Sequence, residues 1–379
     1  MNHEEKNINK KEGRHLIIDY FSCSFPLLCY QDDYELVIVN QVRNMISDFF
    51  NYTPVDGDKE ESYSRFKYIF TIGEFIELKL GGPLLKSGHK TCMIEMKGEG
   101  CREFERLCPE KTWIDLFDFF ITRLNGKCSR IDVTIDDYSG DIVDFNWTKK
   151  KLDIKHFTTT FRNKNYVIHG NESGGFSLQF GSRKTQMLVI YEKLKEQLSK
   201  NKECNQDYWV RYEMRYFHDK ANDVCLDLIE NGEEGFKDYC FGILYKMLDI
   251  KVDNNYASDS QNKVETDPLW LKFLETNEKV TISSISKRKS TYDSYYAYAL
   301  PVISYFYLTL LLLNDGDFYI TDSKMLEIAV KGLKQFDSKK LKRLNYYLEE
   351  HNLKPIDMDK FNSIYDKMKD ELDDRSLPF

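Results

Sequence analysis

Alternation of polar and apolar residues with a period of two dominates the first 216 residues of this chain. Side chains on a β-strand point alternately to its two faces, so the alternation predicts strands with one buried and one polar face. Helical spacing of apolar residues at Tyr34–Phe50 and Thr112–Leu124 adds helices between the strands. The fold class that follows is α+β, with a mostly antiparallel sheet in the N-terminal part. The expected strands are His15–Phe25, Tyr68–Thr71, Phe75–Leu80, Thr91–Lys97, Ser129–Asp136, Phe176–Phe180, Gln186–Glu192 and Tyr208–Tyr216.

The pattern of apolar residues becomes helical from about Val224 onward. The polar segment Asp253–Thr266 is the best candidate for a linker, so we expect an α+β domain over residues 1–255 and a helical domain over residues 265–379. The uncharged stretch Tyr295–Leu313 is just long enough to span a bilayer, but it contains Pro301 and five tyrosines. A helix buried in the helical domain is therefore favoured over a membrane span. The two halves of the first domain could be a diverged duplication, although no internal sequence identity supports one.

Charge is distributed unevenly along the chain. The formal net charge of −8 argues against a protein that coats nucleic acid by bulk charge, but residues 147–220 hold 15 basic and 8 acidic residues, a local charge of +7. This stretch could face a phosphate backbone, or it could be an ordinary solvated surface. Nine cysteines without a CxxC spacing, and a polar N-terminus without the apolar core of a signal peptide, favour a cytoplasmic protein.

Two strands carry charged residues on one face. Asp132 and Asp136 share a face but lie about 13 Å apart along a strand, so they could share a divalent ion only if the strand bends or ends between them. Arg211, Glu213 and Arg215 share a face of the second strand, where the ordinary interpretation is a ladder of solvated ion pairs. If the two faces adjoin, Glu213 could complete a carboxylate cluster.

The segment Phe176–Lys193 is typical of a hairpin with a basic turn at Gly181–Lys184. Tyr191 lies near its end, two positions before Lys193. A phenol of pKa about 10 is a weak nucleophile until a cation or metal favours the phenolate, and most tyrosines are simply packed aromatics. Other aromatic residues of the basic stretch could stack unpaired bases or belong to the core. They are Phe161, Tyr166, Phe176, Phe180 and Trp209.

Four motifs follow one another in a fixed order: Ile18–Phe21 with Ser24–Pro26, Arg130–Asp137, Phe180–Lys184 with Ile190–Lys193, and Arg211–Glu213. Together they resemble the replication-initiation-factor family, which comprises rolling-circle plasmid initiators and the relaxases of conjugative elements in Gram-positive bacteria. The resemblance extends over roughly residues 15–220. Two departures from the family pattern are Thr185, where serine is expected, and Glu192, where aspartate or asparagine is common.

The resemblance implies that the first domain nicks and rejoins DNA at an origin. Tyr191 would attack a phosphodiester and keep the 5′ phosphate as a phosphotyrosyl intermediate, in either plasmid replication or conjugation. Mg²⁺ or Mn²⁺ would be held by Asp132, Asp136 and Glu213, with Asp19 as an outside candidate. The DNA backbone would be held by Arg183, Lys184, Lys193, Arg211 and Arg215. The implied partners are origin DNA, single-stranded at the nick, a host helicase and a second copy of the chain.

Two other functions are compatible with the sequence. A DNA-binding regulator without enzymatic activity could retain the fold, with Tyr191 as a structural residue. A metal nuclease that uses water as its nucleophile would need the carboxylates but not Tyr191. The helical C-terminal domain would serve DNA binding or an accessory role in each case.

Overall fold

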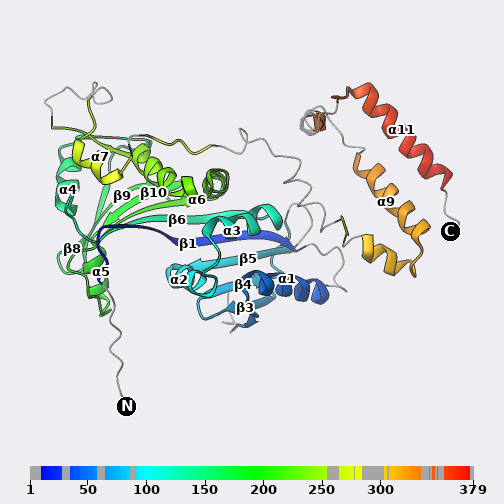
Figure 1. Ribbon diagram of the computed structural model, residues 1–379, viewed down its shortest axis with the longest axis horizontal. Coiled ribbons are helices and arrows are strands. Elements are labelled where there is room, and N and C mark those ends of the chain that lie inside the picture. The colour runs from blue at the N-terminus through cyan, green and yellow to red at the C-terminus, as the bar shows by residue number, and fades with distance from the viewer. Residues whose placement is uncertain are drawn as a thin grey trace, which may run out of the picture. The chain divides into compact units, whose positions relative to one another are not determined.

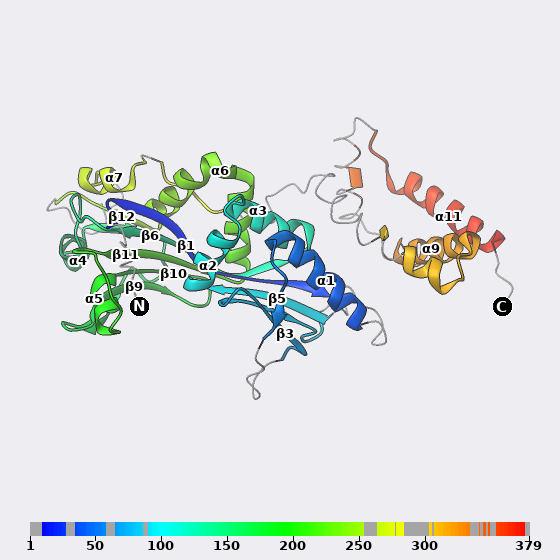
Figure 2. The same ribbon diagram turned by 60° about the horizontal axis from the view of Figure 1, so that its bottom comes forward.

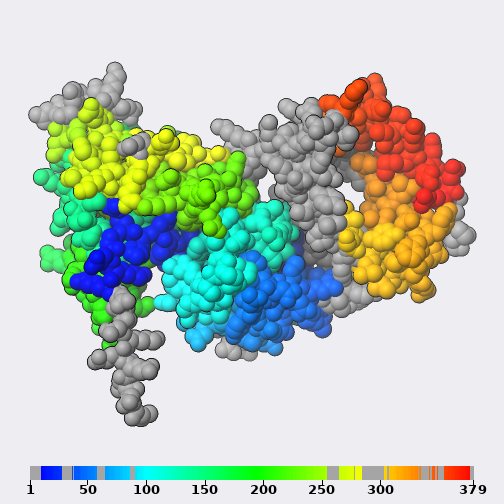
Figure 3. All heavy atoms as spheres, in the orientation of Figure 1, coloured from blue at the N-terminus to red at the C-terminus, as the bar shows by residue number. Residues whose placement is uncertain are grey.

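The computed structural model divides the chain into two compact units, Met1–Arg288 and Lys289–Phe379, each of which is described by itself. Figure 1 shows the ribbon of both units, and Figure 3 gives the heavy atoms of the described residues in colour. The structure describes residues 10–27, 35–57, 65–85, 90–253, 264–276, 278–283, 303–304, 307–333, 341, 344–345, 348 and 354–375.

A ten-stranded antiparallel sheet forms the centre of the first unit. Its strand order is β2-β3-β4-β5-β1-β6-β11-β10-β9-β8, so β1 and β6 lie together in the middle. Each of the eight expected strands is present, which confirms the α+β class. The strands are β1 (Arg14–Leu27), β2 (Val55–Asp56), β3 (Tyr68–Ile72), β4 (Ile76–Leu80), β5 (Lys90–Lys97), β6 (Lys127–Asp137), β8 (Val167–Asn171), β9 (Gly175–Ser182), β10 (Gln186–Tyr191) and β11 (Val210–Phe217).

The sheet consists of two halves with the same order of elements. In the first half, β1 is followed by helix α1 (Glu35–Phe50) and then by β2 to β5, and β5 returns to pair with β1. In the second half, β6 is followed by helix α4 (Phe145–Asp153) and later by β8 to β11, and β11 returns to pair with β6. The shared order supports the duplication hypothesis at the level of topology.

Helices cover one face of the sheet. Figure 2 shows α1, α3 (Trp113–Phe117) and α6 (Asp219–Met247) on the same side of it. Beneath them lie the apolar positions of the central strands, including Val133, Met214 and Tyr216, which are fully buried. The opposite face, which we call the polar face, carries the charged positions of the same strands. The remaining helices of this unit are α2 (Gly98–Leu107), the π-helical turn Asp118–Arg123, α5 (Lys193–Ser199) and α7 (Pro268–Leu274).

The first unit extends further along the chain than the boundary expected at residues 253–266. Helix α7, which that boundary assigned to the helical domain, packs on the sheet: Phe273 lies 4.8 Å and Trp270 6.0 Å from the ring centre of Tyr212. Both α7 rings are fully buried. A two-stranded sheet of β7 (Phe157–Thr159) and β12 (Leu248–Ile250) also ties the end of α6 to the first unit.

The second unit is helical where the structure describes it, as expected. Its long helices are α9 (Phe318–Leu333) and α11 (Met358–Asp374), which contact each other. Most of the apolar stretch Tyr295–Leu313 lies outside the described residues; only 303–304 and 307–313 are described, as helix. Within the described part of the chain, no helix is long and apolar enough to cross a membrane.

The hairpin that carries Tyr191 depends on a glycine near the end of β9, just before its turn. Gly181 has φ +78°, and a β-carbon there would lie 2.3 Å from the backbone oxygen of Gln186. We therefore expect Gly181→Ala to destabilise the protein by at least about 1–2 kcal/mol and to lower Tm by several degrees in differential scanning fluorimetry. Gly174→Ala is the matched control, because its β-carbon would meet nothing closer than 3.4 Å. Equal Tm values for the two variants would contradict this role.

Candidate active site on the polar face of the sheet

The register of four neighbouring strands brings the predicted site residues onto the polar face. Asp136 on β6 pairs with Arg211 on β11, which in turn pairs with Tyr191 on β10. These three residues form one row across the sheet. Further along the same two strands, Asp132 pairs with Arg215. Glu213 lies on β11 between Arg211 and Arg215, on the same face. The adjacency of the two charged faces, which the sequence left open, is therefore present.

Arg211 binds two carboxylates at once. Its Nε and one terminal nitrogen donate to the two oxygens of Asp136, at 2.6 and 2.9 Å, and the other terminal nitrogen donates to Asp19 at 2.7 Å. Asp19 reaches this position because β1 bulges between Ile18 and Tyr20, which shifts its register against β6. The guanidinium is 4% exposed, so it is a buried link between the two halves of the sheet.

A second pair of carboxylates lies beside this link. Arg130 binds Asp132 through two nitrogens, and Arg215 binds Glu213 in the same bidentate way at 3.0 and 2.9 Å. Asp132 and Glu213 are also hydrogen-bonded to each other. Burial raises the pKa of Asp132 to about 7, against the hydrogen bonds from Arg130. Burial also raises the pKa of Glu213, but the hydrogen bonds and charge of Arg215 outweigh it and lower the net pKa.

The predicted metal ligands are brought onto one face but not into one cluster. Asp132 and Glu213 touch, whereas Asp136 is held by Arg211, as is the outside candidate Asp19. Among the residues that the structure describes, no three His, Cys, Asp or Glu side chains gather closely enough to hold an ion. The ligand set of Asp132, Asp136 and Glu213 thus stays a prediction.

Tyr191 is half-buried at the end of β10, beside β11. Its ring packs on a small apolar cluster of Met187, Val189 and Phe217. Burial, followed by the charge of Glu213, raises the pKa of its phenol well above the usual value, and Arg211 opposes this shift. Lys193 lies 5.5 Å from the ring centre, but its ammonium is paired with Glu196 at 2.6 Å. The phenol is therefore protonated before substrate binds.

The five residues predicted to hold the DNA backbone occupy different environments. Arg183 and Lys184 are exposed in the turn at the start of β10, about 17 Å along the strand from Tyr191. Lys193 lies beside Tyr191. Arg211 and Arg215 already hold carboxylates. The turn and the tyrosine are thus at opposite ends of one hairpin, not in one cluster.

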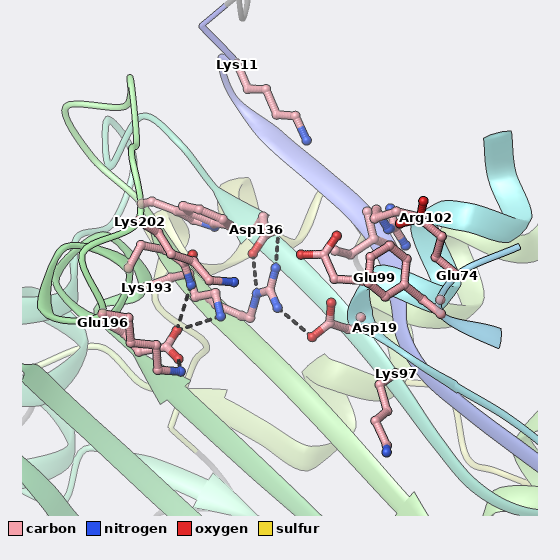
Figure 4. A pocket seen from close by; sticks show the side chains of 18 of the residues that line it. Lys11, Asp19, Glu74, Lys97, Glu99, Arg102, Asp136, Lys193, Glu196 and Lys202 are labelled. Atoms are coloured by element: carbon pink, nitrogen blue, oxygen red, sulfur yellow. Dashed lines mark hydrogen bonds and ion pairs between the residues drawn. The ribbon is translucent and has the colours of Figure 1, made fainter. Parts of the chain in front are cut away.

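A pocket of about 600 Å³ opens next to the Arg211 link. In Figure 4, Asp136 and Asp19 converge from neighbouring strands, Lys193 and Glu196 come from α5, and Glu99 and Arg102 face them from α2. The sequence did not indicate that α2, which belongs to the first half of the sheet, forms one side of this pocket. Nothing in the local pattern of residues shows which segments meet across the sheet. Tyr138, which lines the pocket together with Trp209, was also missed. Tyr138 is two residues from Asp136, and Trp209 is two residues from Arg211. Residues two apart on a strand share a face, so this spacing could have indicated that both rings lie on the polar face.

The other aromatic candidates for base stacking belong mostly to the core. Phe161 and Tyr166 lie 5.7 and 5.6 Å from the ring of Phe180, which is itself buried. Trp209 is different, because it lines the pocket.

Comparison with known proteins agrees with this architecture. Two family descriptions match successive parts of the chain: "Rolling Circle replication initiation protein N-terminal domain" over residues 15–121 and "Replication initiation factor" over residues 126–304. The chain belongs to the replication initiation factor family.

Two individual proteins illustrate the similarity. The Bacillus subtilis (strain 168) protein named "Putative DNA relaxase NicK" is 26% identical over 262 residues, which are 67% of this chain and 67% of NicK. The solved rolling circle replication initiator protein from Geobacillus stearothermophilus is 18% identical and matches with a TM-score of 0.52. That match covers 72% of this chain and all of the solved one, and it shows a shared fold.

The raised pKa of Asp132 predicts a pH-dependent stability. A carboxyl whose folded pKa of about 7 exceeds its unfolded value near 4 binds more protons in the folded state, so stability falls as pH rises from 4 to 7. Without added metal, we expect Asp132→Asn to raise Tm at pH 8 and to change it less at pH 5. Asp141→Asn, at an exposed carboxyl whose pKa is lowered, is the control and should give no gain. A lower Tm of Asp132→Asn at pH 8 would refute the assignment.

Proposed function

We propose that this protein nicks one strand of DNA at an origin and later rejoins it, with Tyr191 as the nucleophile. The observation that carries the proposal is the row of Tyr191, Arg211 and Asp136 beside the carboxyl pair of Asp132 and Glu213. Membership of the replication initiation factor family supports it, as does the similarity to a protein named as a DNA relaxase. Such an enzyme could serve plasmid replication or conjugative transfer.

The chemistry is a transesterification. The phenol oxygen of Tyr191 attacks the phosphorus, the bond from phosphorus to the 3′ oxygen breaks, and the 5′ phosphate stays on the tyrosine. The phenol proton passes to a carboxylate whose charge acts on it, with Glu213 the strongest such group. The resulting carboxylic acid then gives this proton to the departing 3′ oxygen, which leaves as a hydroxyl and restores the carboxylate. Because one phosphodiester replaces another, the step is reversible and the same site can rejoin the strand.

The residues present fit a divalent cation in part. Asp132 and Glu213 are two carboxyls that share a hydrogen bond, and a cation that replaces their shared proton would let both be charged. Mg²⁺ or Mn²⁺ bound there would polarise the scissile phosphate and stabilise charge on the departing 3′ oxygen. Asp136 would join this pair only if Arg211 released it, so we assign Asp136 and Asp19 first to holding Arg211.

The positions of the basic residues suggest that the DNA strand runs along the length of the hairpin. Lys193 is placed to hold a phosphate beside Tyr191, and Arg183 and Lys184 to hold the backbone near the turn. The tyrosine reaches a phosphate only where the strand is unpaired. We extend the proposal to a host helicase that keeps the strand open and to a homodimer as the working assembly.

Removal of the nucleophile is the direct test. Tyr191→Phe should lower formation of a covalent protein–DNA adduct by at least about a thousandfold, because phenylalanine has no oxygen with which to form the ester. The assay uses labelled single strands that tile the DNA flanking the gene, with Mn²⁺, followed by denaturing electrophoresis. Tyr68→Phe, at a half-buried tyrosine on β3, is the matched control and should keep full activity.

The same gels separate the rival functions. Cleavage without a covalent band, unchanged in Tyr191→Phe, would indicate a metal nuclease that uses water. Binding without any cleavage would indicate a DNA-binding regulator. Either result would refute the tyrosine mechanism.

Metal dependence is tested at the carboxyl pair. We expect Asp132→Ala and Glu213→Ala to lose nicking by about a thousandfold or more and to lose Mn²⁺ binding in titration calorimetry, while duplex binding stays within a few-fold. Asp141→Ala, at an exposed carboxylate, should change none of these properties. Full nicking in the presence of a chelator, or by Asp132→Ala or Glu213→Ala, would show that the mechanism does not use a metal at this carboxyl pair.

A further inference from the structure

Two aromatic rings continue the polar face one row beyond Tyr191. Val210 pairs with Asp137 at the ends of β11 and β6, which places Trp209 opposite Tyr138 in the next row. Their ring centres lie 5.2 Å apart, with 35° between the planes. The Tyr138 hydroxyl donates to Asp136 at 3.3 Å, which ties this row to the row of Arg211 and Tyr191.

Cations lie on both sides of the two rings. Lys193 is 5.9 Å from the ring centre of Trp209 and 5.5 Å from that of Tyr191, so the two rings are neighbours across a single side chain. Arg211 lies 5.5 Å from the Trp209 ring, and Lys11 lies 5.5 Å from the Tyr138 ring. An aromatic surface between ammonium groups suits a flat, electron-rich group attached to phosphates.

The rings line the 600 Å³ pocket together with Asp136, Arg211 and the α5 end of the hairpin (Figure 4). The Trp209 indole N–H is buried and has no acceptor among the residues that the structure describes. By contrast, the indole of Trp113 donates to Glu105 and that of Trp270 donates to the backbone oxygen of Leu248. Buried indoles normally find such an acceptor, so the Trp209 ring differs from the other two in not being fixed by a hydrogen bond of its N–H.

We propose that Trp209, backed by Tyr138, receives one unstacked nucleobase of the DNA strand next to the scissile phosphate. The base stacks on the indole, and Lys193 and Lys11 neutralise the phosphates on its two sides. Removing that base from its neighbours would extend the backbone across Lys193 toward Tyr191. This inference rests on the proposed function, because it takes the strand at Tyr191 to be single-stranded DNA.

A merely structural role for Trp209 makes a different prediction. If the indole only fills space, a leucine of similar apolar character replaces it and the affinity for bases is unchanged. If the indole stacks a base, an aromatic ring is required, and phenylalanine rescues what leucine loses. Base–aromatic stacking changes affinity by about 5- to 150-fold per base.

The test compares two probes in a Tyr191→Phe background, where no covalent bond can form. Fluorescence anisotropy at 50 mM KCl gives the affinities for a 15-nucleotide thymidine strand and for a fully abasic strand with the same number of phosphates. We expect the unsubstituted Trp209 protein and Trp209→Phe to prefer the thymidine strand by at least about fivefold, and Trp209→Leu to bind both strands equally. Trp147→Leu, at a half-buried tryptophan on α4 outside the pocket, should keep the preference.

Three outcomes would overturn the inference. They are a full preference in Trp209→Leu, no preference with Trp209 present, or an equal loss for both strands in Trp209→Leu. If Trp209→Leu has a lowered Tm, Trp209→Phe still tests the inference, because it also removes the indole but keeps an aromatic ring on which a base can stack. A base preference that depends on Trp209, together with a failure of Tyr191 to form an adduct, would refute the proposed function and leave the base site in place.

Discussion

The site depends on one buried guanidinium. Arg211 on β11 holds Asp136 of the second half and Asp19 of the first half, so a single side chain fixes the separation of the two halves at the point where Tyr191 lies. A buried charge of this kind is stable only while its partners are in place, and loss of one partner in such pairs costs about 3–5 kcal/mol. The same contacts that make the site rigid therefore also make it intolerant of change.

Neighbouring arginines explain how four carboxylates can lie close together although they have little contact with solvent. Three arginines cover them: Arg130 with Asp132, Arg215 with Glu213, and Arg211 with both Asp136 and Asp19. Compensation is incomplete, because burial still raises the pKa of Asp132 to about 7. Burial and the charge of Glu213 likewise raise the pKa of Tyr191, so its phenol keeps its proton. In the proposed mechanism, a phosphate or cation that binds here would have to displace some of these ion pairs.

The sequence predicts much of this arrangement because strands have a fixed period. The alternation in Ser129–Asp136 and in Tyr208–Tyr216 is enough to place Asp132, Asp136, Arg211 and Glu213 on polar faces, and both strands are present. It could not predict that the two faces adjoin, because pairing between distant strands depends on topology. The Asp19 bulge, the wall from α2 and the packing of α7 on Tyr212 were missed for the same reason: each depends on contacts between segments far apart in the chain.

The position of the basic turn at the far end of β10 has a geometric consequence. Arg183 and Lys184 are separated from Tyr191 by the rigid length of the strand, about 17 Å, and not by a flexible linker. Under the proposed function, a hairpin that held the DNA backbone at its turn and cut it at Tyr191 would set the distance between these two points by its own number of residues.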